Sequence, residues 1–254
     1  MKQAGFWISL GVSALALSAC SGGQRQGPPT KVINRVLATA PGKAQPSTIV
    51  AREIAYAQDA KERGQFVAAE DFAAPGALIH VRGGPVPFSA LASFLETTDI
   101  QTQWSPRTIV MSCDGALAIS QGRFADKDGK VGNYVTTWAR QKDGEYLWTY
   151  DVAGYDDPQP PPRPDFEDGD IVVTAIDAVQ GLVASCPSGC GDTPPPPAMP
   201  IGEDGKSDAQ LSRDGTLRWH WEHTAEGMKN VTAEYFYEGE WVTAVEESLA
   251  PVGD

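Results

Sequence analysis

Two side chains in the first 155 residues of the chain could transfer a proton. His80 lies in the apolar run 77–81, and the ordinary pKa of histidine, about 6.5, suits proton transfer near neutral pH. Asp151 lies at the end of the apolar run 145–152, and a carboxylate can act as a general base. Each has a structural alternative, because a lone histidine in a strand is more often a core residue and an aspartate at a strand end can cap a turn. The sequence leaves both roles open.

Cys20 ends the run ALSAC at 16–20, which follows Lys2 and an apolar segment from Phe6 to Leu17. This run resembles the lipid-attachment signal of bacterial lipoproteins, and the segment is shorter than the ~20 apolar residues that cross a bilayer. We expect residues 1–19 to be a signal peptide and acylated Cys20 to anchor the chain in the lipid bilayer. Ser21 favours the outer membrane, with the protein facing the periplasm. The alternative is an ordinary secretory signal with an incidental cysteine.

The other three cysteines predict a disulfide and one buried thiol. Cys186 and Cys190 lie in a segment rich in proline and glycine, and an oxidising compartment favours a local disulfide between them. Cys113 lies beside an apolar run and is expected to be buried and unreactive.

No cofactor, metal or nucleic acid is expected. His220 and His223 are close in sequence, but they share a strand face only if the strand is interrupted, so they make a poor metal site. No phosphate loop, nucleophile elbow or metalloprotease motif occurs at a recognisable spacing. The formal net charge is −13 and no cluster of Lys and Arg occurs, which argues against nucleic-acid binding.

Hydrophobic periodicity predicts the elements that position these residues. Helices are expected at 47–63, 66–73 and 88–96 and a short strand at 77–81. Four runs with a period of two follow at 104–113, 116–125, 131–140 and 145–152. The Asp-Gly pairs between them favour tight hairpin turns. This order predicts an α+β fold in which a curved antiparallel meander wraps the first helix.

The segment from Ile49 to Gly154 resembles the nuclear-transport-factor-2-like superfamily, which includes SnoaL cyclases and ketosteroid isomerases. The resemblance rests on EIAYAQDAKERGQFVAAEDFAAPGALI at 53–79, GALAISQGRF at 115–124 and YVTTWARQKDGEYLWTYDVAG at 134–154. It implies a cone-shaped fold with an internal pocket, into which an Asp, Glu or His of the catalytic relatives projects as general base. The recognisable catalytic pairs of those enzymes are not reproduced. The pocket candidates are His80, Arg82, Trp104, Arg123, Tyr134, Trp138, Tyr150 and Asp151.

The remaining segments flank this expected domain at 47–155. Residues 20–46 are expected to be a flexible tether, and 156–169 a proline-rich linker. Residues 170–254 contain further period-two runs, at 171–176, 181–185, 216–223, 231–237 and 240–246. They predict a small antiparallel β unit, either packed on the first domain or independent. No internal repeat is evident.

The expected function is non-catalytic. The cone would hold a small apolar ligand, or its open sheet face would pair with a second copy of the chain or with an envelope protein. One alternative is an acid/base enzyme of the isomerase, dehydratase or cyclase type with His80 or Asp151 as base. Another is a structural envelope protein whose cone is filled by aromatic side chains.

Overall fold

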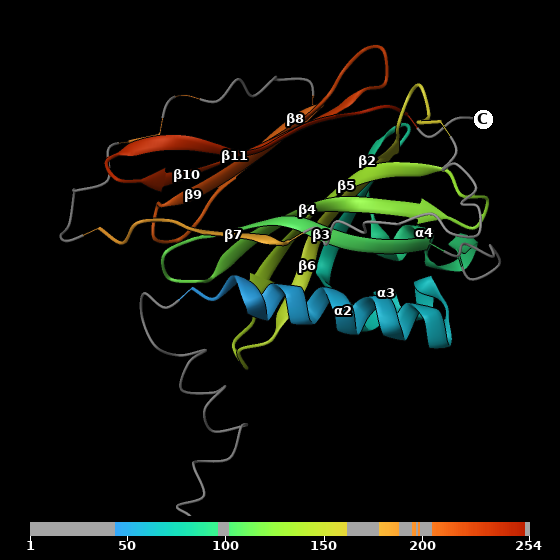
Figure 1. Ribbon diagram of the computed structural model, residues 1–254, viewed down its shortest axis with the longest axis horizontal. Coiled ribbons are helices and arrows are strands. Elements are labelled where there is room, and N and C mark those ends of the chain that lie inside the picture. The colour runs from blue at the N-terminus through green and yellow to red at the C-terminus, as the bar shows by residue number, and fades with distance from the viewer. Residues whose placement is uncertain are drawn as a thin grey trace, which may run out of the picture.

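A computed structural model describes residues 44–95, 102–161, 178–187, 195–196, 198 and 205–251. Cys20 and Cys190 lie outside the described residues, as do 171–176. Helices, a large sheet and a small sheet form three layers (Figure 1). In the described part of the chain, no helix is long and apolar enough to cross a membrane.

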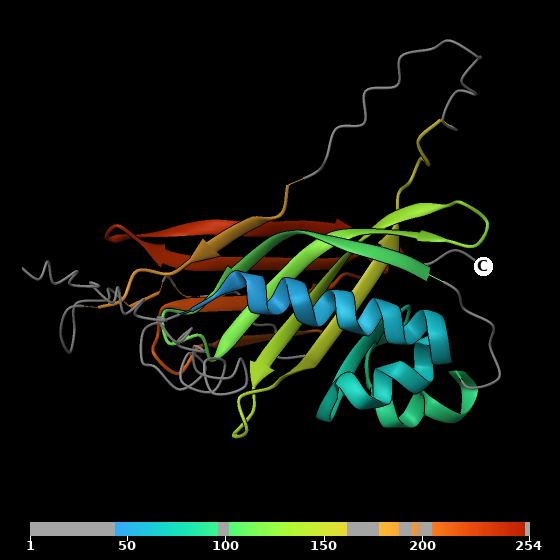
Figure 2. The same cartoon turned by 60° about the horizontal axis from the view of Figure 1, so that its bottom comes forward.

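The helical layer covers one face of the large sheet (Figure 2). It consists of α2 (Pro46–Arg63), α3 (Gln65–Phe72) and α4 (Phe88–Leu95). Pro46 begins α2 where its missing N–H costs nothing, and Gly64 ends it at a φ of 98°. Ile49 and Glu53 are one turn apart on the buried face of α2. These helices agree with the expected ones to within two residues at the described ends.

The large sheet has seven strands in the order β2-β1-β6-β5-β4-β3-β7. They are β1 (Ala73–Val81), β2 (Gly84–Pro87), β3 (Thr102–Met111), β4 (Leu117–Asp126), β5 (Val131–Arg140), β6 (Tyr146–Tyr155) and β7 (Gln180–Val183). Strands β3 to β6 form the predicted meander. The helices and this curved mixed sheet confirm the α+β cone fold expected from the resemblance.

The small sheet has the order β11-β10-β9-β8 and is antiparallel throughout. Its strands are β8 (Ser207–Leu211), β9 (Leu217–His223), β10 (Lys229–Tyr237) and β11 (Glu240–Leu249). Trp219, Trp221 and Val231 form one core with Val110, Ile119, Val135 and Val152 of the large sheet. The predicted small β unit therefore exists and packs on the cone. It covers the sheet face through which we expected self-pairing.

Strand β7 lies outside the small unit to which the sequence assigned it. Residues 180–183 pair in parallel with β3, in a register that places Gln180 opposite Thr108, so β7 is an edge of the large sheet. A parallel pair between distant segments leaves no local sequence signal, because the hairpin turns that mark antiparallel neighbours are missing.

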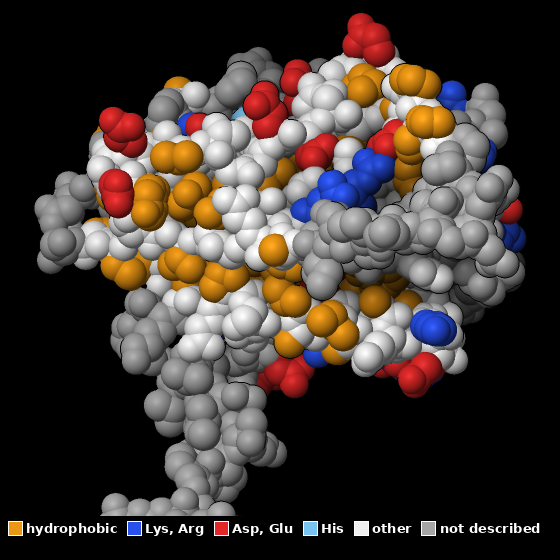
Figure 3. Space-filling view, viewed as in Figure 1, with side chains coloured by type: hydrophobic (Ala, Val, Ile, Leu, Met, Phe, Trp, Pro, Cys, Tyr) orange, Lys and Arg blue, Asp and Glu red, His pale blue; other side chains and the backbone are white. Residues whose placement is uncertain are grey.

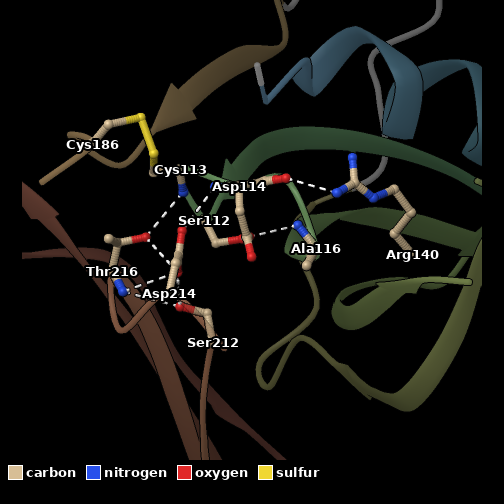
Figure 4. Close-up of a disulfide and its surroundings, with 9 residues drawn as sticks. All are labelled: Ser112, Cys113, Asp114, Ala116, Arg140, Cys186, Ser212, Asp214 and Thr216. Atoms are coloured by element: carbon tan, nitrogen blue, oxygen red, sulfur yellow. Dashed lines mark hydrogen bonds between the residues drawn. A yellow bond between two sulfur atoms is a disulfide. The ribbon is translucent and has the colours of Figure 1, made fainter. Parts of the chain in front are cut away.

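This parallel pairing changes the predicted disulfide. Cys186 follows β7, Cys113 follows β3, and the two are joined by a disulfide with a Cα–Cα distance of 5.1 Å (Figure 4). The expected Cys186–Cys190 bond and the expected free Cys113 are both wrong. Proximity in sequence suggested the local bond, whereas the strand pairing brings a more distant cysteine to Cys186.

The first turn is the same in both meanders, a repeat that was not predicted from the sequence. In the first, Ser112 Oγ donates to Asp114 Oδ1 (2.7 Å) and accepts from Leu117 N (3.1 Å). In the second, Ser212 Oγ donates to Asp214 Oδ1 (2.6 Å) and accepts from Leu217 N (2.9 Å). Both are S-x-D-G-x-L segments, and each joins the first two strands of a four-stranded antiparallel meander.

The two turns also contact each other (Figure 4). Asp114 N donates to Asp214 Oδ2 (2.8 Å), and Cys113 N donates to Thr216 Oγ1 (2.9 Å). With the disulfide at Cys113, these bonds join the small sheet to the large sheet at the first turn of both meanders.

Candidate functional site

A β-bulge in β6 decides which residues face the helices. Trp138 lies opposite Trp148 and Thr137 opposite Tyr150, so Thr149 is the extra residue. Such a bulge reverses the alternation of side chains along a strand. Trp148 accordingly belongs to the helix-side core, and Tyr150 to the core shared with the small sheet.

Asp151 therefore faces the helices. It is part of a cross-strand row in which Ser120, Thr136 and Asp151 are direct neighbours on β4, β5 and β6. Thr136 Oγ1 donates to Asp151 Oδ1 at 2.5 Å. Ser120 hydrogen-bonds to Glu53 of the covering helix, which identifies the face. We call this side of the sheet, beneath α2, the cone interior.

Glu53 is the most buried carboxyl group there, with 2% of its surface exposed. Oε1 accepts from Ser120 Oγ (2.5 Å), and Oε2 accepts from Trp104 Nε1 (3.0 Å) and Tyr134 Oη (3.1 Å). Trp138 Nε1 in turn donates to Ser120 Oγ (3.0 Å). Both oxygens of Glu53 thus have protein donors, as a buried polar group requires.

Both interior carboxyl groups hold protons more tightly than usual. Burial raises the pKa of Glu53 to about 7, against the effect of its three hydrogen-bond donors, and the charge of Asp151 raises it further. Burial also raises the pKa of Asp151 to about 6, while its bond from Thr136 and the charge of Lys229 lower it. Near neutral pH, small changes in the surroundings would therefore change their protonation.

Aromatic rings surround these carboxyl groups. Tyr56 of α2 stacks on Phe72 with ring centroids 4.8 Å apart and meets Trp104 edge-on at 4.9 Å. Asp151 and Tyr56 are half-buried, whereas Tyr134 and Trp138 are buried. The interior thus combines apolar rings with one partly accessible carboxyl group, Asp151.

His80 and Tyr150 lie on the opposite face of the sheet, between the two sheets. Tyr150 Oη and His80 Nδ1 are 2.6 Å apart, and His80 Nε2 is 2.9 Å from His223 Nδ1. His80 also meets Trp221 edge-on. Burial, followed by the charges of His223 and Lys229, lowers the pKa of His80 to about 3. His80 is a core residue, and it does not share an interior with Asp151.

The eight pocket candidates therefore separate into two groups. Trp104, Tyr134, Trp138 and Asp151 meet in the cone interior. The other four do not: His80 and Tyr150 lie between the sheets, Arg82 is exposed in the β1–β2 turn, and Arg123 pairs with Asp156 (2.5 Å).

Glu53 is the site residue that sequence reasoning missed. A signal was present, because Glu53 follows Ile49 by four residues and so falls on the apolar face of the first helix. A charged residue on that face is rarely buried unless it has partners. These partners come from three strands distant in sequence.

The described residues also form an open cleft of about 440 Å³ at one end of the two sheets. It is lined by Asn133, residues 154–158, Pro160, Met228 and residues 248–250. Tyr155 donates to Asp126 (2.8 Å) and Asp156 pairs with Arg123, so two of its polar side chains already have partners. The cone interior, which combines two carboxyl groups of raised pKa, is the better candidate.

Neither the face drawn in Figure 3 nor the metal-ligating side chains of the described residues add a competing site. On the face in Figure 3, acidic side chains are scattered and do not form a single patch. No three His, Cys, Asp or Glu side chains within the described ranges are placed to hold a metal ion.

Comparisons with known proteins give similarities of fold. No family model matches the chain, and no curated protein matches it. A conserved protein from Planctomyces limnophilus is similar at 13% identity, covering 43% of this chain and 98% of that chain, with a TM-score of 0.34. Nuclear transport factor 2 from Cryptosporidium parvum is similar at 11% identity, covering 44% and 95% (TM-score 0.35). ActVI-ORFA from Streptomyces coelicolor is similar at 17% identity, covering 44% and 96% (TM-score 0.35).

Proposed function

We propose that this protein is an envelope lipoprotein whose cone interior binds a small, mostly apolar ligand. The observation that carries this proposal is the half-buried carboxyl group of Asp151, which faces an interior lined by aromatic rings. Ligand sites are commonly apolar with a few polar groups that fix orientation. The ligand should therefore pair an apolar body with an N–H or O–H donor.

Asp151 is better suited than Glu53 to receive such a donor. Among the hydrogen bonds of the described residues, Asp151 accepts one, at Oδ1. Glu53 accepts three and is almost fully buried. Glu53 thus orders Trp104, Ser120 and Tyr134 around the interior, while Asp151 is the group with capacity left for a ligand.

The lipoprotein part of the proposal rests on the run ALSAC at 16–20. Acylation of Cys20 would hold the cone near an outer-membrane surface facing the periplasm, at the end of a tether of residues 20–46. A disulfide between Cys113 and Cys186 supports an oxidising compartment.

A second candidate function is acid/base catalysis with Asp151 as the base. A pKa raised to about 6 favours this role, because a general base works best when its pKa lies near the working pH. His80 is not proposed as the base, since it faces the small sheet and not the cone interior. An isomerase or dehydratase would need Asp151 to contact the reacting proton.

Native mass spectrometry of the Cys20→Ala chain tests ligand binding. We expect a non-covalent adduct of small mass that is lost in Asp151→Asn and retained in Glu62→Gln, a matched change at an exposed position of α2. An adduct that survives Asp151→Asn would contradict the role of Asp151. If the adduct is chemically altered on incubation with the wild-type chain but not with Asp151→Asn, the catalytic alternative is favoured.

A further inference from the structure

Lys229 is a buried cation between the two sheets. It begins β10, and only 1% of its surface is exposed. Its Nζ donates to the carbonyl oxygen of Ala153 on β6 at 2.5 Å. A buried ammonium group is costly unless its charge is compensated. A carbonyl oxygen supplies a hydrogen bond but no negative charge.

The strand that Lys229 contacts also carries Asp151. Ala153 lies two residues after Asp151 on β6, so the ammonium group reaches the backbone of this segment from the small-sheet side. Tyr150, the residue before Asp151, packs on the same side against Trp219 of β9, with ring centroids 4.8 Å apart. The small sheet thus contacts β6 just before and just after Asp151 in the sequence, while the carboxyl group of Asp151 points into the cone.

The charges around this pair come from several elements. On the cone side, the negative charge of Asp151 contributes to the raised pKa values of Glu53 and Tyr56 of α2 and of Tyr134 of β5. On the side of the small sheet, His80 of β1 and His223 of β9 lie near Lys229, which pairs with His223 in the β9–β10 ladder. Asp151 and Lys229 attract each other, so each favours the charged form of the other.

We propose that Lys229 is a positioning residue, whose buried charge acts across β6 to hold Asp151 in the anionic form that the cone ligand meets. This inference rests on the proposed binding role of Asp151. It gives the small sheet a function beyond covering the cone sheet, because it supplies the charge that prepares the carboxylate for a ligand donor. By linkage, a ligand that neutralises Asp151 would also weaken proton binding by Lys229.

Three substitutions separate the charge of Lys229 from its hydrogen bond. Lys229→Gln keeps a donor for Ala153 but removes the charge. Lys229→Met removes both, and Lys229→Arg keeps both. The readout is the titration of the Asp151 carboxyl group by NMR in protein labelled with ¹³C at aspartate, with the signal assigned through its loss in Asp151→Asn.

We expect the Asp151 midpoint to rise by at least about 0.5 pH unit in both Lys229→Gln and Lys229→Met, and to stay near wild type in Lys229→Arg. An Asp151 midpoint that is unchanged in Lys229→Gln overturns the inference. Lys229 would then only connect the two sheets through its hydrogen bond to Ala153. Because no ligand is present, this result is independent of the ligand-binding test. If Lys229→Met does not fold, Lys229→Gln against Lys229→Arg still decides the question.

Discussion

Trp148 and Tyr150, two residues apart on β6, face opposite sides of the large sheet. In a regular strand they would share a face, but the extra residue Thr149 reverses the alternation between them. The side chain of Thr149 is 2.7 Å from that of Thr137 on the neighbouring strand. The reversal turns Asp151 into the cone, so the candidate site depends on this bulge.

Replacing Glu53 should change how stability depends on pH. Burial raises the pKa of Glu53 to about 7, so the folded state favours the protonated form. The stability that this provides is fully present below the ordinary pKa of a glutamate, about 4.3, and is lost as the pH rises through 7. From pH 6 to 8, the wild-type protein should lose about 1.3 kcal/mol of unfolding free energy through this group, and Glu53→Gln should not show this loss. Urea denaturation measures this, and an equal loss in both proteins would contradict the pKa shift.

Replacing His80 should have the opposite pH signature. Its pKa is lowered to about 3 by burial and by neighbouring positive charges, so folding favours the neutral ring. The contribution is complete above pH 6.5 and is lost as the pH falls towards 3. His80→Gln should therefore be less stable at pH 7 but lose less stability between pH 6.5 and 4.5. The difference between the two proteins isolates His80, because both retain the carboxyl groups. If the unfolding free energies of wild type and His80→Gln depend on pH in the same way, the lowered pKa of His80 is contradicted.

Removing the disulfide should destabilise the fold through a specific pair of cysteines. The bond closes a loop with a sequence separation of 73, and chain entropy predicts a loss of about 4 kcal/mol on its removal. Cys186→Ser and Cys113→Ser should each cost this amount in chemical denaturation under non-reducing conditions. Cys190→Ser serves as the control and should be close to wild type. A large loss of unfolding free energy in Cys190→Ser with none in Cys113→Ser would instead support a local Cys186–Cys190 bond.

Changing Cys20 should release the protein from the membrane. Without the thiol, the signal has no site for acyl chains, and a protein without them loses its anchor. Cell fractionation should find Cys20→Ala in the soluble fraction and wild type in the membrane fraction. Ser21→Ala is a matched neighbour and should remain with the membrane. An unchanged distribution of Cys20→Ala would remove the anchoring proposal.

Features encoded locally were predictable from the sequence, and features made by distant pairing were not. Glycines in Asp-Gly turns such as Gly115 and Gly144 adopt positive φ, which is why the meander could be recognised. The parallel pairing of β7 with β3 left no such mark, and with it the partner of Cys186 was missed. The bulge at Thr149 depends on how β5 and β6 align, so the direction of Asp151 was undetermined. Glu53 was hidden in a helix whose burial depends on strands far along the chain.

The central claim is that Glu53 and Asp151 share one interior, and the titration of Glu53 in Asp151→Asn tests it most directly. Negative charge on Asp151 raises the pKa of Glu53, so its removal should lower the Glu53 midpoint. The measurement is ¹³C NMR of the glutamate carboxyl groups, with Glu53 assigned through Glu53→Gln and exposed Asp128→Asn as the control. We predict a clear fall in the Glu53 midpoint in Asp151→Asn and none in Asp128→Asn. An unchanged midpoint in Asp151→Asn would place Asp151 outside the cone and contradict the account.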